Sequence, residues 1–490
     1  MSMRKKNRNR KTKPAALIGL LIGLIAFAAA APAELIVNYN FTTNASVPDG
    51  SGQYTNSHVL GGLSSFSNVT MSLNLTTQTP SNPMWLGDLY STLTYGTASE
   101  ANRVAVLLNR PGRDVGNPFG SSLSSLNVTL SEAAIDNIWG TTSSTGTYKS
   151  DGRLGVNPYG PPVNFNDADR NATLSALNGA ALASRRFTLL MADTSGGGLA
   201  TLSSWGLSLR GTAAASGTMS ADAANGGTMA ISDDGGTNTL GASVVTSQNG
   251  GGALSVTATG NLTFSGQVGG TGGLNKLGSG SLTLTNNSNN YTGATIVNAG
   301  TLFANNTSGS ATGTGAVTVN NSGSILGGTG RISGNVTINS GAILLGGRGT
   351  STSGTLTLAG SLTLNSNSVI ELALGSSGAH STLARSGSGT WSFQSNQQFS
   401  FADLGVQPGT YDNIITGLAG SVNTTGWQIE NMDWVGFFLY DGFGNIDLTL
   451  TAVPEPGTWL AGALAMVVVL FRQRKKRSFG RQGQGKADKL

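Results

Sequence analysis

Short runs in which apolar and polar residues alternate dominate the chain from residue 35 onward. Residues 69–75 and 126–130 alternate strictly, and residues 203–209 repeat the same style. Antiparallel sheets with one face against a core and the other in solvent produce this alternation. Asn-Pro, Pro-Gly and Gly-Pro-Pro sequences between the runs are turn signals. The pattern predicts an all-β fold that begins with a jelly-roll-like β-sandwich over residues 35–211.

From residue 212 to residue 374 the apolar runs become shorter and recur at a regular interval. Val-Thr-Val at 317–319, Val-Thr-Ile at 336–338 and Leu-Thr-Leu at 356–358 follow one another at spacings of 19 and 20 residues. A unit of that length cannot bury its own apolar side chains, so it must stack on its neighbours. We therefore expect a right-handed parallel β-helix, with Val, Ile and Leu inward and Gly and Asn in its turns.

Aromatic residues return in residues 375–452, which we expect to form a β cap over the open end of the helix. Trp391, Trp427, Trp434 and the run 437–440 lie here. We interpret this aromatic cluster as the core of the cap, with a sugar-binding platform as the alternative.

The first 33 residues have the pattern of a signal peptide. Seven basic residues precede the apolar stretch 15–30, and no acidic residue lies among them. Ala31 and Ala33 then supply the small side chains that signal peptidase requires before Glu34. We expect cleavage at this point, and retention as an uncleaved anchor is the alternative.

The other end of the chain carries a second addressing pattern. Val453, Pro454, Glu455 and Pro456 precede the apolar segment 457–471, and a cluster of Arg and Lys follows it. The prolines exclude helix from the tetrapeptide. The segment is short beside the roughly 17–25 residues of a transmembrane helix, and the basic cluster favours a cytoplasmic end.

This order of features resembles the PEP-CTERM sorting signal over residues 453–477, followed by a basic tail at 478–490. The resemblance implies processing by an exosortase-like membrane enzyme. It also implies transient membrane anchoring before the protein reaches the cell surface or the extracellular space. Whether the signal is cleaved or kept stays open.

Charge and composition describe the exported body more clearly once these two ends are set aside. Of the 28 Lys and Arg residues, 7 precede residue 15 and 8 follow residue 471, which leaves 13 against 22 acidic residues. The net charge of −9 argues against nucleic acid as a partner. The chain has no cysteine and 2 histidines, which excludes disulfides, thiolate metal sites and multi-histidine centres.

Several motifs follow one another in the first region. They are Val-Pro-Asp-Gly at 47–50, Leu-Gly-Asp-Leu at 86–89, and the runs 106–112, 187–193 and 198–207. Together they resemble the P domain (P/Homo B domain) of subtilisin-like proprotein convertases, although Asn82–Trp85 replaces the usual His-Thr pair and Phe187 replaces a usual Trp. The resemblance implies a jelly-roll sandwich, in some members with calcium, for which Asp88 and Asp193 are the candidate ligands.

No complete catalytic constellation emerges from the sequence. A Ser-His-Asp triad needs a histidine beside its nucleophile, whereas His58 and His380 each stand alone in surface-like or turn-like sequence. The paired acids Asp167 and Asp169, and the pair at 233–234, are expected to be solvated turn residues. Weak calcium ligation and, last, catalysis are the alternatives for these acids.

One unit of the middle region runs from Gly-Leu-Asn-Lys-Leu-Gly at 273–278 through Asn-Tyr-Thr-Gly at 290–293 to Asn-Ala-Gly-Thr-Leu at 298–302. This unit resembles the autotransporter-associated β-strand repeat. The resemblance implies a passenger β-helix of a surface protein. The PEP-CTERM-like end indicates a route other than self-transport through a barrel.

We therefore expect an exported, non-enzymatic surface or matrix protein without a cofactor, calcium being the one exception left open. Its expected partners are signal peptidase, an exosortase-like enzyme, the membrane before processing, and extracellular polysaccharide or surface proteins. One alternative is an accessory role in a serine-type endopeptidase system. A polysaccharide-active β-helix enzyme is a second alternative, although residues 212–374 hold only four acidic and three basic residues.

Overall fold

The computed structural model describes residues 33–96, 103–179, 185–453, 466–469 and 472. Within them nearly all regular structure is β-strand, so the predicted all-β class is confirmed. Most of the predicted signal peptide, the residues Pro454, Glu455 and Pro456, and most of segment 457–471 lie outside the described residues. No helix in the described part is long and apolar enough to cross a membrane.

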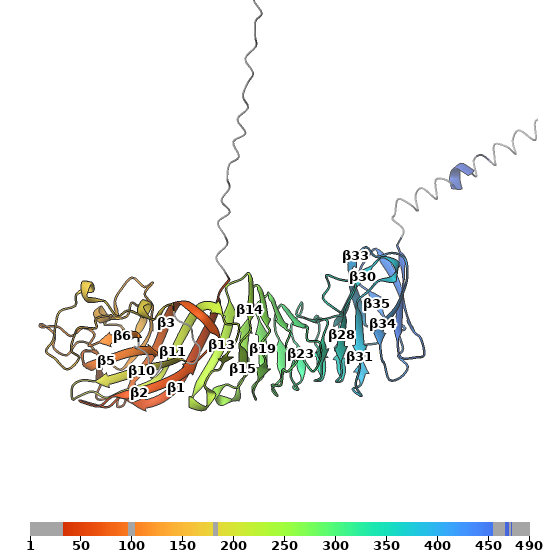
Figure 1. Ribbon diagram of the computed structural model, residues 1–490. Coiled ribbons are helices and arrows are strands. Elements are labelled where there is room, and N and C mark those ends of the chain that lie inside the picture. The colour runs from red at the N-terminus through yellow and green to blue at the C-terminus, as the bar shows by residue number, and fades with distance from the viewer. Residues whose placement is uncertain (1–32, 97–102, 180–184, 454–465, 470–471, 473–490) are drawn as a thin grey trace, which may run out of the picture. The chain divides into compact units, whose positions relative to one another are not determined.

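Two sheets form the sandwich, and Figure 1 shows them at the red-to-yellow end of the chain. Their neighbouring strands are antiparallel, except that β8 and β9 run parallel. One sheet has the order β2 (Tyr54–Leu60), β10 (Arg185–Asp193), β5 (Leu89–Gly96) and β6 (Arg103–Asn109). The other contains, in order, β9 (Thr145–Tyr148), β8 (Ser125–Leu130), β3 (Leu63–Thr77), β11 (Ala200–Ala213) and β1 (Leu35–Ser46).

The alternation in the sequence sets the inward face of these strands. Met71 and Leu73 of β3 and Leu126 and Val128 of β8 are buried in one core, while the residues between them face outward. Shorter elements complete this region. They are the pair β4 (Met84–Trp85) and β7 (Ser122–Leu123), and the 3-10 turns η1 (Leu86–Asp88), η2 (Ile138–Gly140), η3 (Asp167–Asp169) and η4 (Leu174–Leu177).

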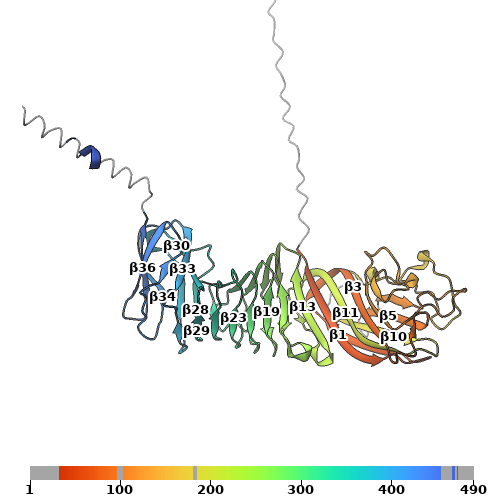
Figure 2. The same cartoon turned by 180° about the vertical axis from the view of Figure 1, so that it is seen from behind.

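Parallel strands then stack coil upon coil, which confirms the predicted β-helix (Figures 1 and 2). One face contains β13 (Gly227–Asp233), β16 (Leu254–Thr257), β19 (Leu274–Leu277), β21 (Thr295–Val297), β23 (Val317–Val319), β26 (Val336–Ile338), β29 (Leu362–Leu364) and β32 (Trp391–Ser392). A second contains β14 (Thr237–Leu240), β17 (Asn261–Phe264), β20 (Ser281–Leu284), β22 (Thr301–Ala304), β24 (Ile325–Gly327), β27 (Ile343–Leu345), β30 (Val369–Gly375), β33 (Gln398–Leu404) and β35 (Gln428–Ile429).

Strands of the remaining faces form two further groups. The first is β12 (Thr218–Met219), β15 (Ser243–Val245) and β18 (Val268–Gly269). The second is β25 (Arg331–Ile332), β28 (Thr355–Leu358), β31 (Thr382–Arg385), β34 (Gly409–Thr416), β37 (Ile446–Ala452) and β36 (Trp434–Tyr440). The 3-10 turns η5 (Ala223–Asn225), η6 (Asn249–Gly251) and η7 (Ser376–Gly378) lie between strands.

The regular sequence interval identified two equivalent strands and one that is not equivalent. Residues 317–319 and 336–338 are β23 and β26, which pair in register on one face. Residues 356–358 belong to β28, which lies on another face and pairs with β25 and β31. The next strand beside β26 is β29. The prediction of one uniform repeat was therefore wrong at this coil, because nine residues separate β27 from β28 whereas three separate β24 from β25, and the longer loop lengthens the sequence between equivalent positions.

Strand β13 joins the sandwich to the helix within a single sheet. Val37 of β1 lies opposite Leu209 of β11 on one side and opposite Ile231 of β13 on the other. The pairing of β1 with β13 is antiparallel, whereas β13 pairs with β16 in parallel. The sandwich sheet and one face of the helix are therefore parts of one 13-stranded sheet.

The last strands cover the end of the helix with a small aromatic core. Phe399, Trp427 and Phe438 are buried, and their ring centroids lie 4.3 to 5.4 Å apart. Core packing thus accounts for the centre of the predicted aromatic cluster. Phe437 and Leu439, which alternate with Phe438 on β36, are 66% and 65% exposed.

Candidate functional site

Asp88 and Asp193, the predicted calcium ligands, meet at one end of the smaller sandwich sheet. Asp193 ends β10 and pairs with Leu89 at the start of β5, and Asp88 directly precedes Leu89. The amide and hydroxyl of Thr194 both donate to the Asp88 carbonyl, at 2.7 and 2.9 Å. Asp88 is 5% exposed and Asp193 1% exposed. The structure therefore brings together two acids that lie far apart in the sequence.

Burial dominates the electrostatics of this pair, although the Arg113 guanidinium forms an ion pair with Asp88 Oδ1 at 3.7 Å. Burial raises the pKa of Asp193 to about 7, and the negative charges of Asp88 and Asp49 contribute. Burial also raises the pKa of Asp88, against a hydrogen bond from Ser195 and the charge of Arg113. The Asp88 Oδ1 atom is buried without a hydrogen-bond partner. Such a pair favours a bound cation or a proton.

The donor set fits a hard cation only in part. Ca²⁺ takes about six to eight oxygen ligands, and carboxylates can supply two to four of them. In the described part of the chain, no group of three or more His, Cys, Asp or Glu side chains is placed to hold a metal ion. A Ca²⁺ ion at Asp88 and Asp193 would therefore take its other ligands from backbone carbonyls and water.

The other paired acids divide into two kinds. Asp167 and Asp169 lie exposed in the turn η3, as predicted for solvated turn residues. Asp233 is 4% exposed, so that prediction was wrong for it. Burial alone would raise the pKa of Asp233, but hydrogen bonds from Thr259, Gly260 and Gly235 together hold it below its ordinary value. Its carboxylate joins successive turns of the helix, because it accepts hydrogen bonds from Gly235 in its own turn and from Thr259 and Gly260 in the next.

His58 is buried in strand β2, and its predicted surface or turn position was wrong. Its Nδ1 atom lies 2.8 Å from the Asp222 carboxylate, and its Nε2 atom lies 2.6 Å from the Asn56 side-chain oxygen. The ring stacks on Phe41 at a centroid distance of 3.7 Å. Burial lowers the pKa of His58, although the hydrogen bond and charge of Asp222 oppose this. His58 thus links the sandwich to residues at the start of the helix.

Few residues of the two predicted processing sites lie in the described part of the chain. Glu34, beyond the expected cleavage point, binds Arg210 at 2.7 Å and receives a hydrogen bond from Ser67 at 3.0 Å. Val453 is 44% exposed, and its amide donates to the Asp433 carbonyl at 2.8 Å. Ala33 is half-buried, whereas Ala31 lies outside the described residues.

A buried lysine marks the unit at residues 274–302. Lys276 occupies the inward register position that Val256 and Val297 occupy in the coils on either side. Its Nζ atom donates to the carbonyls of Leu277 and Gly278 and to that of Ala299 in the next coil, at 2.8 to 2.9 Å. Burial lowers the pKa of Lys276 to about 8, against the attraction of Asp233. The lysine is a polar crosslink between turns.

A ladder of asparagines continues from this unit along the helix. The side-chain amides of Asn298, Asn320, Asn339 and Asn365 each donate to the side-chain oxygen of the preceding asparagine, and Asn275 receives the first bond. The four distances are 2.7 to 2.9 Å. This ladder was not predicted from the sequence. Its signal was an Asn directly after each of the strands β21, β23, β26 and β29.

The coil that contains Lys276 is also the part that comparison with known proteins identifies. Residues 274–302 match the passenger-associated-transport-repeat. This confirms the predicted autotransporter-associated repeat and indicates an exported, cell-surface protein. No curated protein and no solved structure matches the chain. The resemblances to the P domain and to the PEP-CTERM signal stay predictions.

Proposed function

We propose that this protein is a non-enzymatic structural and adhesive component of a bacterial surface or extracellular matrix. The observation that carries the proposal is the continuous sheet. The sandwich is joined through β1 and β13 to a helix that contains a passenger-associated-transport repeat. A rigid junction of this kind suits a stalk that holds a binding module at a fixed orientation, which a flexible linker would not do.

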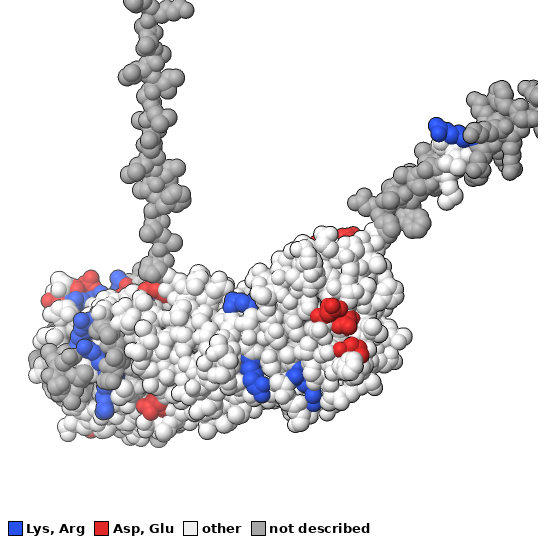
Figure 3. Space-filling model, turned by 45° about the vertical axis from the view of Figure 1, so that its right-hand side comes forward, with Lys and Arg blue, Asp and Glu red and all other residues white. Residues whose placement is uncertain are grey.

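The outer surface of the helix suits multivalent contact with polysaccharide. In Figure 3 most of the visible surface is uncharged, and the charged side chains form only small, scattered groups. Thr318, Thr337 and Thr363 occupy one outward column in register on successive strands. Hydroxyl groups both donate and accept hydrogen bonds, so such a column can meet the hydroxyl groups of a glycan chain. Extracellular polysaccharide or other surface proteins are therefore the partners we propose.

We further propose that the sandwich is a P-domain-like module and that both termini direct export. Signal peptidase would cleave before Glu34, and an exosortase-like enzyme would process the Val453–Pro456 motif after transient membrane anchoring. Glu34 begins the described fold almost at once, and β37 ends at Ala452, directly before the motif. The described fold thus reaches the first residue of the motif, because the Val453 amide donates to the Asp433 carbonyl.

Cell fractionation tests the proposal. The full chain should reach the cell surface or the medium in a host that has a PEP-CTERM sorting system, with Glu34 as its first residue. A chain with Pro454→Ala, Glu455→Ala and Pro456→Ala should remain in the inner membrane. The matched control is Pro408→Ala, which removes an exposed proline directly before β34 and leaves the motif intact.

Binding and turnover assays separate the adhesive role from an enzymatic one. The secreted chain should bind the exopolysaccharide of that host and release no reducing sugar or peptide from it. A cytoplasmic location, or robust glycan or peptide cleavage by the purified chain, would overturn the proposal.

A further inference from the structure

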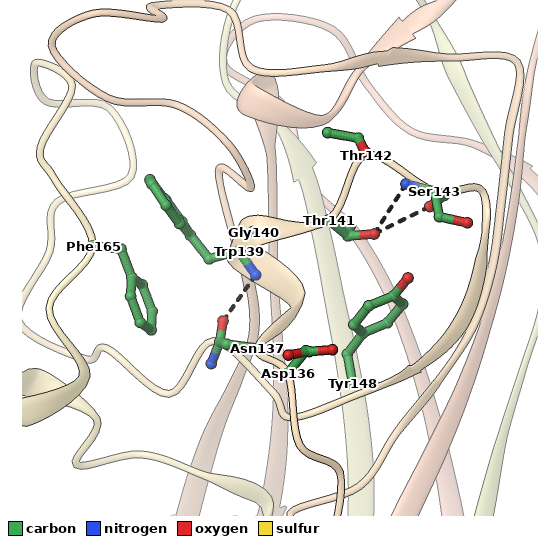
Figure 4. A pocket seen from close by; sticks show the side chains of 9 residues that line it. All are labelled: Asp136, Asn137, Trp139, Gly140, Thr141, Thr142, Ser143, Tyr148 and Phe165. Carbon is green, nitrogen blue, oxygen red and sulfur yellow. Dashed lines mark hydrogen bonds between the residues drawn. The ribbon is translucent and has the colours of Figure 1, made fainter.

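The loops around β9, at the edge of the larger sandwich sheet, border an open pocket of about 370 Å³. Ligand pockets commonly have volumes of roughly 300–1,000 Å³. Figure 4 shows its lining, in which aromatic rings and small polar side chains come from the loop at residues 136–143, from Tyr148 and from Phe165. The lining residues are Asp136, Asn137, Trp139, Gly140, Thr141, Thr142, Ser143, Tyr148 and Phe165.

A stacked aromatic pair forms one side of this pocket. The rings of Trp139 and Phe165 have centroids 5.2 Å apart and planes that differ by 23°. Both residues are half-buried, so part of each ring remains open to solvent. In Figure 4 the two rings lie together on one side of the turn at residues 137–141, and the ring of Tyr148 lies on the other side.

A buried arginine holds the aromatic pair in place. The guanidinium carbon of Arg153 lies 4.8 Å from the ring centroid of Phe165 and 6.0 Å from that of Trp139. Two hydrogen bonds of 2.8 Å from this guanidinium to the Asp151 carboxylate fix it, and both residues are at most 2% exposed. A cation over an aromatic face is attracted by the ring quadrupole. The Arg153 guanidinium, held in place by Asp151, therefore supports the two rings.

Hydrogen bonds of the backbone and of the Asn137 side chain hold the polar side of the pocket. Lys149 donates its amide to the Asp136 carbonyl at 2.7 Å, and Ile138 donates to the Lys149 carbonyl at 3.0 Å. The Asn137 side chain accepts from the Trp139 amide and donates to the Ser150 carbonyl, both at 2.8 Å. The loop is thus organised before any ligand arrives, which lowers the entropic cost of binding.

Two polar groups at the rim remain free to bind a ligand. Asp136 and Thr142 are exposed, and their side chains make no hydrogen bond within the described part of the protein. A carboxylate accepts hydrogen bonds, and a hydroxyl both donates and accepts them. By contrast, the Thr141 and Ser143 hydroxyl groups already take part in hydrogen bonds within the loop.

We propose that this pocket binds a neutral pyranose unit of an extracellular polysaccharide. The apolar C–H face of the sugar would stack on the part of the Trp139 ring that Phe165 leaves open, because aromatic faces carry partial negative charge. Its hydroxyl groups would donate to Asp136 and exchange hydrogen bonds with Thr142. The Asp136 carboxylate disfavours anionic sugars. The inference rests on the proposed function only for the presence of such a polysaccharide outside the cell.

Calorimetric titration of the full chain tests this site with defined probes. The neutral probes are cellohexaose, mannohexaose and xylohexaose, and the anionic probe is hexagalacturonic acid. At least one neutral hexasaccharide should bind, and the anionic one should bind at least ten-fold more weakly. Trp139→Ala should weaken binding at least ten-fold, and Asp136→Asn and Thr142→Val should each weaken it several-fold.

Trp85→Ala is the matched control, because Trp85 is also half-buried and lies beside a phenylalanine, Phe119, with centroids 5.9 Å apart. It should leave binding unchanged within two-fold. If Trp139→Ala lowers the thermal midpoint, the test relies on Asp136→Asn and Thr142→Val, because both of these residues are exposed.

Two outcomes overturn the pocket assignment. In one, no neutral hexasaccharide binds the full chain at millimolar concentration. In the other, binding occurs but the Trp139, Asp136 and Thr142 variants bind as the wild type does. If these variants also bind the host exopolysaccharide normally, the pocket is refuted while the proposed adhesive function stands.

Discussion

The backbone amide of Glu34 donates a hydrogen bond of 2.9 Å to a carboxylate oxygen of Asp234. Glu34 precedes β1 and Asp234 follows β13, so this contact closes one end of the strand pair that joins the sandwich to the helix. Arg210 forms ion pairs with the carboxylates of both residues. Cleavage before Glu34 would convert the amide into an α-ammonium group, and the hydrogen bond into an ion pair.

We predict that Asp234→Asn destabilises the processed protein more than the unprocessed one. The difference in unfolding free energy should be about 0.5–1 kcal/mol, because the pair is partly exposed. Urea denaturation of chains that begin at Glu34 or at Met1 measures the two unfolding free energies. The substitution weakens the Arg210 contact in both chains, so this loss cancels when the two effects are compared. Asp167→Asn, at a side chain 77% exposed, is the control. An equal effect on both forms would contradict the prediction.

The shared sheet predicts that the sandwich and the adjoining coils unfold together. Val37 is fully buried on β1, between Leu209 and Ile231. Val37→Ala should cost roughly 1–3 kcal/mol from lost burial and the cavity left behind, and should lower the unfolding temperature of both parts. Scanning calorimetry measures this. Val59→Ala, at a residue 47% exposed on β2, should have little effect. A shift confined to one of two separate transitions would refute the coupling.

The burial of His58 predicts a loss of stability in mild acid. Its pKa is lowered in the folded protein, so the unfolded chain binds the proton more readily. The stability that neutral His58 contributes is therefore complete above the ordinary histidine pKa of about 6.5, and it is lost as the pH falls below that value. The thermal midpoint should decline from pH 7 to pH 5 more steeply in wild type than in His58→Gln. His380→Gln is the control, and identical slopes for wild type and His58→Gln would exclude this role.

Lys276 should stabilise the helix through its three carbonyl contacts. Lys276→Met keeps most of the aliphatic chain but leaves buried carbonyl oxygens without this donor. The expected loss is about 1–3 kcal/mol in the unfolding free energy. Denaturant titration measures it, and Lys149→Met, at a half-buried loop lysine, provides the comparison. An unchanged or higher stability would mean that the cost of burying the ammonium group outweighs its hydrogen bonds.

Calcium should stabilise the sandwich through Asp88 and Asp193. A ligand that binds only the folded state at 100 times its Kd adds about 2.7 kcal/mol. Millimolar Ca²⁺ should therefore raise the thermal midpoint, and a chelator should reverse the rise. Asp88→Asn with Asp193→Asn should abolish the response, whereas Asp167→Asn with Asp169→Asn should preserve it. A response that survives loss of Asp88 and Asp193 would place the ion elsewhere.

Local chemistry made much of the fold predictable. Alternation at residues 69–75 and 126–130 indicated strands with one buried face, and that side-chain period is intrinsic to an extended chain. The short interval between Val-Thr-Val and Val-Thr-Ile indicated stacked coils for a similar reason. The Lys-Leu-Gly unit was recognisable because its matching residues lie close together in the sequence. The interval failed at 356–358, because a longer loop between β27 and β28 placed a strand of another face at that spacing.

The candidate sites were less accessible to such reasoning. Asp88 and Asp193 were proposed together as calcium ligands from a family resemblance, and only the pairing of β10 with β5 brings them to the same end of one sheet. Burial of Asp233 and His58 was missed because each stands among small polar residues that are typical of turns. The pocket at Trp139 and Phe165 depends on Arg153, whose support cannot be read from neighbouring positions.

By itself the sequence determined the all-β class and the stacked coils, because these follow from periodicity within short windows. Only the tertiary structure decided that β1 and β13 make one sheet of sandwich and helix. It also decided which buried polar groups find partners. Both outcomes depend on contacts between residues as far apart as Glu34 and Asp234, where the gain from pairing and burial exceeds any local preference.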